Sequence, residues 1–204
     1  ATAFAFPLGT THVVVVDPGV GTSRRALAAA AHGMYFVGPD NGVLGGILSQ
    51  PDARCVAIEN QGLLRHPVSA TFHGRDVFAP VAAELALGLA LSAVGTPVID
   101  ALPSTLPSAV YSENTVTGEV LGADRFGNLL TNIASSKVPR HWRVSLAQYV
   151  LPFCRTYGDA PEKTPFILDG SEGFLEVAIK EGAAAEFFGS TLGCQIHCTD
   201  HEGN

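Results

Sequence analysis

The feature that most constrains this chain is residues 12–25, which read His-Val-Val-Val-Val-Asp-Pro-Gly-Val-Gly-Thr-Ser-Arg-Arg. Four consecutive valines indicate a strand buried on both faces, as in the centre of a parallel sheet. The run ends at Asp17, where Pro18 and two glycines predict a turn. Such turns at the carboxyl ends of strands bind ligands in open α/β sheets. We therefore expect Asp17, followed closely by Arg24 and Arg25, at the edge of a crevice.

Composition places the chain among ordered globular proteins. Of its 204 residues, 47% are hydrophobic and 15% are charged. This length is enough for one large domain or two smaller ones. The net charge is -7 and the largest basic cluster is Arg24-Arg25, so nucleic acid is not an expected partner. We expect no membrane partner either, because no apolar run approaches spanning length. Four scattered cysteines favour a reduced, cytoplasmic setting.

Two cysteines and two histidines near the C-terminus could be taken for a metal site: Cys194, His197, Cys198 and His201. Their spacing departs from the usual zinc patterns. Alternation along a last strand explains Cys194 and Cys198 equally well. We therefore expect no metal.

Local patterns predict the elements of the first half. Strands are expected from 34 onward and at 54–59, with a helix at 43–50. The small residues at 26–31 indicate a strand or a packed segment. A second helix follows residue 76 or 79, because Val77, Val81, Leu85 and Leu89 recur at helical spacing. His73, Gly74 and Arg75 then lie at its N-terminus, where an anion or a polar oxygen is favoured.

The second half has a different pattern. Prolines interrupt residues 97–111, which predicts a linker between a domain at 1–96 and a domain at 112–204. Beyond it, short alternating runs are bounded by Gly, Pro and Asp, at 115–121, 129–133, 166–168, 174–179 and 195–198. This pattern is typical of a small all-β barrel or sandwich.

Several polar residues admit two interpretations. Asp17 suits catalysis or a simple turn cap, and His73 alone suits a core or capping role. The segment 124–133 is a plain turn, or a loop whose Phe126 stacks on a base while Asn128 reads its edge. Residues 170–173 form a hairpin loop or a nest of N–H groups for a carboxylate. Gly-Val-Gly after the valines fits neither a dinucleotide fingerprint nor a P-loop.

Four long motifs occur in the chain in a fixed order, and their joint occurrence is more specific than any one of them. They are 15–25 (Val-Val-Asp-Pro-Gly-Val-Gly-Thr-Ser-Arg-Arg), 36–42 (Phe-Val-Gly-Pro-Asp-Asn-Gly), 71–82 (Thr-Phe-His-Gly-Arg-Asp-Val-Phe-Ala-Pro-Val-Ala) and 124–133 (Asp-Arg-Phe-Gly-Asn-Leu-Leu-Thr-Asn-Ile). Together they closely resemble the S-adenosyl-L-methionine hydrolase (adenosine-forming) family, or SAM hydroxide adenosyltransferases. SAM-dependent fluorinases and chlorinases are relatives of that family. The resemblance runs over residues 7–198.

The resemblance implies an architecture. It is an α/β domain with a mainly parallel sheet, followed by a smaller C-terminal all-β barrel domain. The family forms homotrimers whose active sites lie between subunits. Its members begin with further strands that carry an Asp-Phe-Gly-like segment, whose aspartate holds the ribose hydroxyls. Nothing similar precedes Ala1. Either this sequence is part of a longer polypeptide, or the protein is truncated and its ribose site is broken. We expect an incomplete or cleaved chain, because every later motif is intact.

The resemblance also implies roles for single residues. The family's Asp-Arg-His triad falls on Asp17, Arg24 and His73, with Arg24 preferred to Arg25 by its position in the motif. The implied substrate contacts are Phe72 and Gly74 for the nucleophile pocket, Asp124 for the methionine amino group, Phe126 and Asn128 for adenine, and Ser171 with the Glu172 backbone for the methionine carboxylate.

The implied activity is hydrolysis of S-adenosyl-L-methionine to adenosine and L-methionine, by attack of water or hydroxide at C5′. SAM is the substrate, and no further cofactor or metal is expected. One alternative is a halogenase that forms 5′-chloro-5′-deoxyadenosine. Asp17 beside His73 favours water, because a carboxylate repels a halide. The other alternative is a non-catalytic adenosine or SAM-binding module, which needs the Phe126–Asn128 pocket but no triad.

Overall fold

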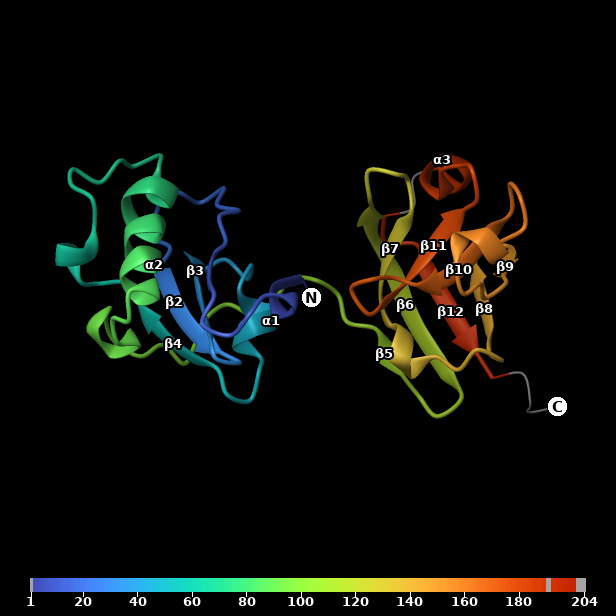
Figure 1. Ribbon diagram of the computed structural model, residues 1–204, viewed down its shortest axis with the longest axis horizontal. Helices are drawn as coiled ribbons and strands as arrows, with labels where there is room; N and C mark the ends of the chain where they lie inside the picture. The colour runs from blue at the N-terminus through green and yellow to red at the C-terminus, as the bar shows by residue number, and fades with distance from the viewer. Residues whose placement is uncertain (1, 190–191, 201–204) are drawn as a thin grey trace. The chain divides into compact units, whose positions relative to one another are not determined.

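The computed structural model describes residues 2–189 and 192–200. The chain divides into two compact units, Thr2–Thr105 and the part from Leu106 onward (Figure 1). Within the described residues, no helix has the length and apolar character needed to cross a bilayer.

The first unit is built on a four-stranded sheet. Its elements are β1 (Thr11–Val13), β2 (Ala26–Ala31), β3 (Met34–Pro39), α1 (Gly45–Leu48), β4 (Arg54–Ala57) and α2 (Ala79–Ala86). The strand order is β1-β3-β2-β4. The strands predicted from 34 and from 54 are confirmed and the segment 26–31 is a strand, whereas the predicted helix at 43–50 shrinks to the single turn of α1.

The sheet is mixed, so the expectation of a mainly parallel sheet is not borne out. β1 pairs parallel with β3, but β2 is antiparallel to both β3 and β4. The cause is the two-residue loop His32-Gly33, whose φ angles of 49° and 68° are those of a tight hairpin turn. A two-residue loop reverses the chain at once, which leaves no room for the crossover that parallel strands require.

The valine run also differs from its prediction. β1 covers only Thr11–Val13 and lies at the edge of the sheet formed by the described residues, not at its centre. Val15 and Val16 are therefore 47% and 65% exposed. An apolar run of this length reports a preference for extended backbone, and it does not report how many neighbours the strand acquires.

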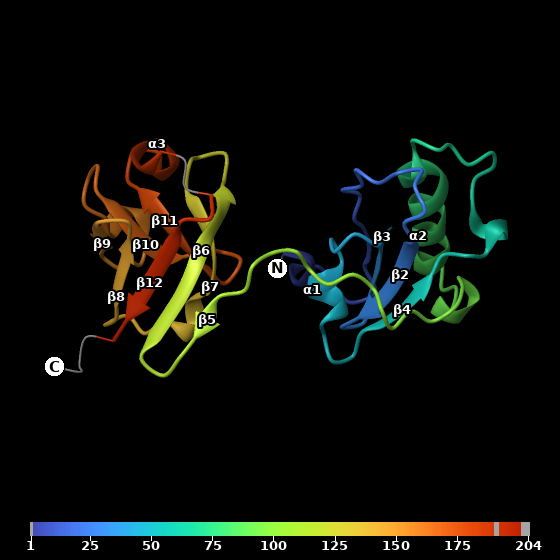
Figure 2. The ribbon, with the colours of Figure 1, turned by 180° about the vertical axis from the view of Figure 1, so that it is seen from behind.

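Helix α2 covers one face of this sheet, as two opposite views show (Figures 1 and 2). Val77, Val81 and Leu85 are buried against Ala28 and Val37 of the sheet, which confirms the predicted helical spacing. Pro80 lies in the first turn, where its missing N–H costs nothing. A π-helical segment, Gly74–Phe78, precedes α2, so His73 stands directly before a helical N-terminus.

The buried Asp76 holds that segment in place. Its carboxylate accepts hydrogen bonds from Arg75 Nε at 2.7 Å, from Arg75 Nη2 at 2.9 Å and from the Ser69 N–H at 2.9 Å. The Arg75 guanidinium, followed by the Ser69 N–H, holds the pKa of Asp76 well below its usual 3.8. A carboxyl with a lowered pKa stabilises the fold above its unfolded pKa and loses that effect as pH falls.

Asp76→Asn is therefore expected to be less stable than the parent at neutral pH. The difference should shrink as pH falls from about 5 to about 2, because only the parent must take up a proton at this site on unfolding. Urea unfolding of both proteins across that range measures it. A stability difference that stays constant with pH would assign Asp76 a purely steric role.

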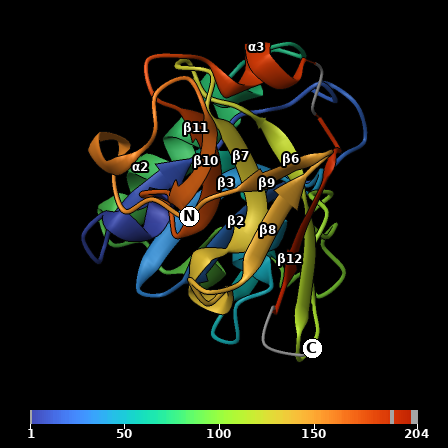
Figure 3. The same ribbon diagram turned by 90° about the vertical axis from the view of Figure 1, so that its right-hand side faces the viewer.

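The second unit is a nearly closed, antiparallel β-barrel. Its elements are β5 (Val110–Tyr111), β6 (Thr115–Ala123), β7 (Leu129–Ala134), β8 (Arg143–Leu146), β9 (Tyr149–Leu151), β10 (Pro165–Asp169), β11 (Phe174–Ile179), α3 (Ala184–Phe188) and β12 (Gln195–Thr199). The order is β10-β11-β7-β6-β12-β8-β9, with β5 beside β6. Figure 3 shows β8 and β12 side by side. Every strand predicted in this half is confirmed, and β5, β8 and β9 were not predicted.

The barrel is closed by the chain that follows β9. The Cys154 N–H donates to the Ile167 carbonyl and the Ile167 N–H donates to the Pro152 carbonyl, each at 2.9 Å. Alternate residues fill the interior, among them Val120, Ile133 and Val177. A barrel, and not a sandwich, is the result.

The outer face of β10 and β11 is covered as well. Phe166, Leu168 and Ala178 pack there against Ala160 and Cys154. This second layer matters for function because it carries residues 153–160 to the side of the barrel on which the loop at 124–128 ends.

Candidate active site

Arg24 joins Asp17 to His73 in the first unit. Arg24 Nε donates to Asp17 Oδ1 at 2.8 Å, and Arg24 Nη2 pairs with Asp17 Oδ2. The same Nη2 lies 2.9 Å from His73 Nδ1. The side chains of Arg24 and Asp17 are only 9% and 6% exposed. The structure thus brings together the three residues that the sequence proposed as a triad.

The turn after the valines creates this arrangement. The Val20 N–H donates to the Asp17 carbonyl at 3.2 Å, and the Thr22 hydroxyl donates to the Gly19 carbonyl at 2.6 Å. Gly21 has φ of +78°, and a Cβ there would lie 2.3 Å from the Ala70 carbonyl oxygen. Only glycine therefore lets the loop turn back and rest on the segment that leads to His73.

Arg25 is placed elsewhere. Its Nε donates to Asp40 Oδ2 at 2.8 Å, and its Nη1 donates to Asp100 Oδ1 at 2.7 Å. Arg24 instead lies over the Phe78 ring, 5.2 Å from its centroid. The two neighbouring arginines thus belong to separate ion pairs, and only Arg24 faces His73.

The contact to Arg24 sets the tautomer of His73. A guanidinium can only donate hydrogen bonds, so Nδ1 must accept and carries no proton. A neutral ring then has its proton on Nε2. That N–H, and not Nδ1, is the atom that remains for a ligand or a water molecule.

Phe72 and Gly74 flank this group through the backbone. Gly74 starts the π-helical segment and lies beside Val15, where an added Cβ would make an ordinary 3.5 Å contact. The Phe72 ring is half exposed and stacks under the Arg75 guanidinium at 4.7 Å. Both residues adjoin His73 in the chain, and the Phe72 ring is half exposed.

In the second unit, Asp124 shapes the loop that carries Phe126 and Asn128. Its Oδ1 accepts from the Phe126 N–H at 2.8 Å and from the Asn128 N–H at 2.9 Å, while its Oδ2 accepts from Asn128 Nδ2 at 3.0 Å. Burial alone would raise the pKa of Asp124, but the hydrogen bonds from Asn128, Phe126 and Gly127 hold it below its usual value. The loop is thereby closed around one carboxylate.

This loop leaves one aromatic face and one amide for recognition. Phe126 is 65% exposed, with Arg125 at 4.7 Å from its ring centroid. Asn128 is buried, and its Nδ2 also donates to the Tyr157 hydroxyl at 3.0 Å. Because both Nδ2 protons are engaged, the Asn128 carbonyl oxygen is the atom left to accept a ligand's N–H.

Gly127→Ala is expected to disrupt this loop. Gly127 has φ of +84°, and a Cβ would lie 2.5 Å from that of Ala183 at the start of α3. The Gly127 carbonyl also accepts from the Ala185 N–H at 2.9 Å, so the strain reaches the helix. We expect a destabilisation of about 1–3 kcal/mol, measured by chemical unfolding. Gly122→Ala, where a Cβ meets open space, is the control.

Ser171 and Glu172 lie in the β10–β11 loop. The Gly170 N–H donates to the Phe174 carbonyl at 2.8 Å, and the Gly173 N–H donates to the Gly170 carbonyl at 3.0 Å. Of the two interpretations left open for this segment, the hairpin loop is the one the structure shows. Ser171 and Glu172 are exposed at its tip.

Tyr157 and Glu176 are two polar residues of this region that the sequence did not indicate. Burial raises the pKa of Glu176, and the charges of Asp124 and Glu172 raise it further. Burial also raises the pKa of Tyr157, with Glu176 and Asp124 as neighbouring charges. Asp124, Glu172 and Glu176 thus lie close enough for their negative charges to interact, and the three are called the acidic surface below. Alternation along β11 could have indicated Glu176, whereas Tyr157 leaves no such signal.

Among residues 2–189 and 192–200, no group of three or more His, Cys, Asp or Glu side chains could hold a metal ion. His201, one of the residues considered for a metal, lies outside the described residues. Cys198 is buried in the barrel core, and burial raises the pKa of its thiol to about 12. Cys198 is therefore a core residue, as strand alternation indicates.

The fold and these side chains define an enzyme of two units, with a hydrogen-bonded Asp-Arg-His group on the first and a loop carrying an exposed aromatic ring and a buried amide on the second. Comparisons with known proteins agree. The SAM hydroxide adenosyltransferase N-terminal domain matches residues 1–95, and the C-terminal domain of the same family matches residues 118–197. The chain belongs to the SAM hydroxide adenosyltransferase family.

The relatives are close in sequence and in fold. A (R)-S-adenosyl-L-methionine hydrolase of Salinispora arenicola is 42% identical over 92% of this chain and 74% of its own length. A conserved protein of Thermotoga maritima superposes with a TM-score of 0.88 at 35% identity, over 97% of this chain and 80% of that one. A fluorinase of Actinopolyspora mzabensis is more distant, with 24% identity over 95% of this chain and 78% of its own length.

Proposed function

We propose that this protein hydrolyses (R)-S-adenosyl-L-methionine to adenosine and L-methionine. The observation that carries the proposal is the Arg24 guanidinium, which ties Asp17 to His73 in a chain 42% identical to a named hydrolase of this substrate. The lower identity to a fluorinase, 24%, makes halogenation the less favoured reaction.

The proposed reaction needs no general acid, and it depends mainly on how the attacking water is positioned. Water oxygen forms a bond to C5′ as the C5′–S bond breaks, and the sulfonium leaves as the neutral thioether of methionine. No group needs to protonate that leaving atom. Water is a poor nucleophile, so holding it in line with the C5′–S bond is the main contribution, and orientation supplies roughly 7–11 kcal/mol in favourable cases.

Asp17 and His73 are the groups proposed to hold the water. Both Asp17 oxygens already accept hydrogen bonds from Arg24, and His73 Nδ1 does so as well. His73 therefore presents its Nε2–H to the water oxygen. Each Asp17 oxygen keeps a second lone pair, so Asp17 is proposed to accept the proton of the water as the C–O bond forms. This arrangement favours a positioned water over full deprotonation before attack.

The second unit is proposed to bind the two ends of the substrate. Phe126 stacks on adenine, and the Asn128 carbonyl oxygen accepts from the exocyclic amino group of the base. The acidic surface of Asp124, Glu172 and Glu176 attracts the methionine ammonium. Ser171 and the Glu172 N–H bind the carboxylate, while Phe72 and Gly74 line the side of the nucleophile.

The assembly and setting belong to the same proposal. We infer a homotrimer with sites shared between subunits, which sedimentation equilibrium of the purified protein tests by its mass. No cofactor other than the substrate, and no metal, takes part in the proposed reaction. The proposed place of action is the cytoplasm.

The decisive experiment incubates the purified protein with each sulfonium epimer of S-adenosyl-L-methionine in ¹⁸O-labelled water, with and without chloride. We expect adenosine and methionine in equal amounts, ¹⁸O in the 5′-hydroxyl, and faster turnover of the (R) epimer. Chloride-dependent 5′-chloro-5′-deoxyadenosine would indicate a halogenase. Tight binding with no product would indicate a non-catalytic module.

A further inference from the structure

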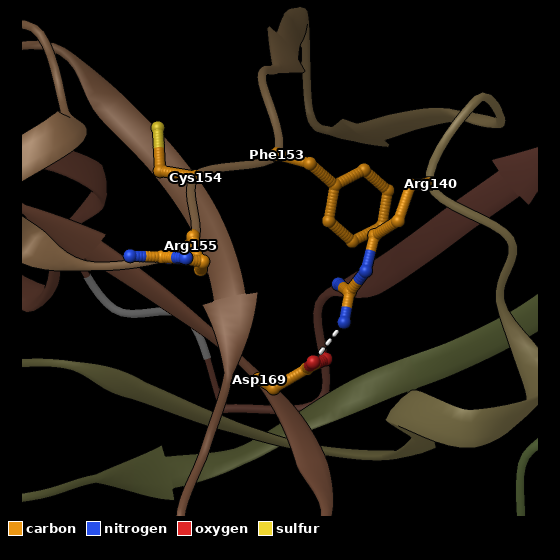
Figure 4. A pocket seen from close by; sticks show the side chains of 5 residues that line it. All are labelled: Arg140, Phe153, Cys154, Arg155 and Asp169. Carbon is orange, nitrogen blue, oxygen red and sulfur yellow. Dashed lines mark hydrogen bonds and ion pairs between the residues drawn. The ribbon is translucent and has the colours of Figure 1, made fainter.

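The second unit carries a cavity whose lining residues have no part in the proposed reaction. Its volume is about 430 Å³, and it is lined by Arg140, Phe153, Cys154, Arg155 and Asp169 (Figure 4). A second cavity of about 480 Å³ shares Arg140 and Phe153 and adds Arg143. Cavities of this size hold small organic ligands.

The register of β10 and β11 places Asp169 of the cavity and Glu176 of the proposed substrate region on opposite faces of the sheet. Leu168 of β10 is paired with Glu176 of β11, so these two side chains share one face of the sheet. Asp169 is the next residue along β10 and points to the opposite face, on which Ile167 fills the barrel interior. The cavity is lined from both faces at the edge of β10, because Asp169 follows the face of Ile167 while Cys154 packs on the face of Phe166 and Leu168.

Arg140 is held in a fixed position within the cavity. Its Nη2 pairs with Asp169 Oδ2, and its guanidinium lies 4.9 Å from the centroid of the Phe153 ring (Figure 4). A guanidinium carries five N–H donors in a planar fork, and one carboxylate oxygen uses only part of them. Arg140 therefore keeps donors available for a second acceptor without having to be ordered first.

The two cavities are lined by several arginines, although the protein as a whole carries a negative net charge. The net charge of the protein is -7, yet three of the four arginines beyond residue 105 line these two cavities. Cys154 adds no negative charge, because burial, and then the charge of Asp159, raises the pKa of its thiol. Asp169 is the one carboxylate among the lining residues, and Arg140 already neutralises it.

We propose that this arginine cavity, formed by Arg140, Phe153, Cys154, Arg155 and Asp169, binds a small molecule through an oxyanion, either phosphate or carboxylate. Arg140 and Arg155 donate charge-assisted hydrogen bonds to the oxyanion. The Phe153 ring packs against the remainder of the ligand. None of the lining residues is among those proposed to bind S-adenosyl-L-methionine. The proposal stands whether or not the hydrolysis is confirmed.

The test is calorimetric titration of the full chain with pyrophosphate and, separately, with citrate. We expect at least one of them to bind, and the stronger of the two identifies the source of the oxyanion. Arg140→Gln and Arg155→Gln should each weaken binding by about tenfold or more, since each removes a charged donor. Asp169→Asn should tighten binding about threefold, because it removes a repelling charge but keeps an acceptor for Arg140.

Arg65→Gln, which removes an equal charge from an exposed position of the first unit, is the matched control and should leave the affinity unchanged. Thermal unfolding of each variant confirms that the barrel is intact; Arg155 is exposed, so its variant is expected to fold. The proposal is overturned if neither probe binds, if both glutamine variants bind as the parent does, or if saturating adenosine displaces the anion.

Discussion

Asp17→Asn is expected to lower kcat by about 10²–10⁴-fold while changing KM little, if Asp17 acts on the attacking water. The substitution keeps the size of the side chain and one acceptor for Arg24. It removes the negative charge that balances a guanidinium only 9% exposed. Steady-state hydrolysis of S-adenosyl-L-methionine, followed by adenosine formation, measures both constants.

A neighbouring ion pair provides the control for this prediction. Asp100→Asn removes a carboxylate that pairs with Arg25, at a side chain that is 76% exposed. It should leave kcat and KM within about twofold, because exposed ion pairs contribute little to stability. Unchanged turnover in Asp17→Asn would remove Asp17 from the proposed mechanism. Equal losses in both variants would point to a general effect of charge.

Asp124→Ala is expected to raise KM by about 10–100-fold, because the carboxylate organises the whole recognition loop. Three hydrogen bonds to Asp124 are lost, two of them from the backbone N–H groups of Phe126 and Asn128. Leaving such donors unpaired costs about 1–3 kcal/mol. Kinetics at several substrate concentrations, together with chemical unfolding, separates weaker binding from loss of the fold.

The variant Asp124→Asn separates the two roles proposed for Asp124, which are to organise the recognition loop and to attract the methionine ammonium. An asparagine oxygen can still accept from the two backbone N–H groups, so the loop should survive. If the charge itself attracts the methionine ammonium, KM rises in this variant although stability is nearly retained. An unaltered KM in both variants would place the amino acid end of the substrate elsewhere.

The sequence predicted the local elements well where periodicity or alternation is strong. The spacing of Val77, Val81 and Leu85 predicted helix α2, and alternation predicted β6 and β11. It failed on β1 because apolar character does not tell how many strands lie beside a run of valines. The short strands β8 and β9 went unpredicted because such brief runs carry little signal.

In the candidate site, too, the sequence indicated the residues that belong to short motifs and missed those brought in by distant segments. Motifs indicated Asp17, His73 and the Asp124 loop, each by its place in a short segment. Tyr157 was not indicated, because its contact with Asn128 joins positions 29 residues apart. The cavity at Arg140 had no motif either, since its lining residues come from three separate segments of the barrel.

By itself, then, the sequence determined the turn after the valines, the main strands and helix, and the family resemblance. Those depend on neighbouring residues, whose hydrogen bonds and side-chain spacing are fixed within a few positions. Only the tertiary structure decided that Arg24 and not Arg25 meets His73, which nitrogen of His73 accepts, and that the first sheet is mixed. Each of these depends on groups far apart in the chain, and packing alone brings them within hydrogen-bonding distance.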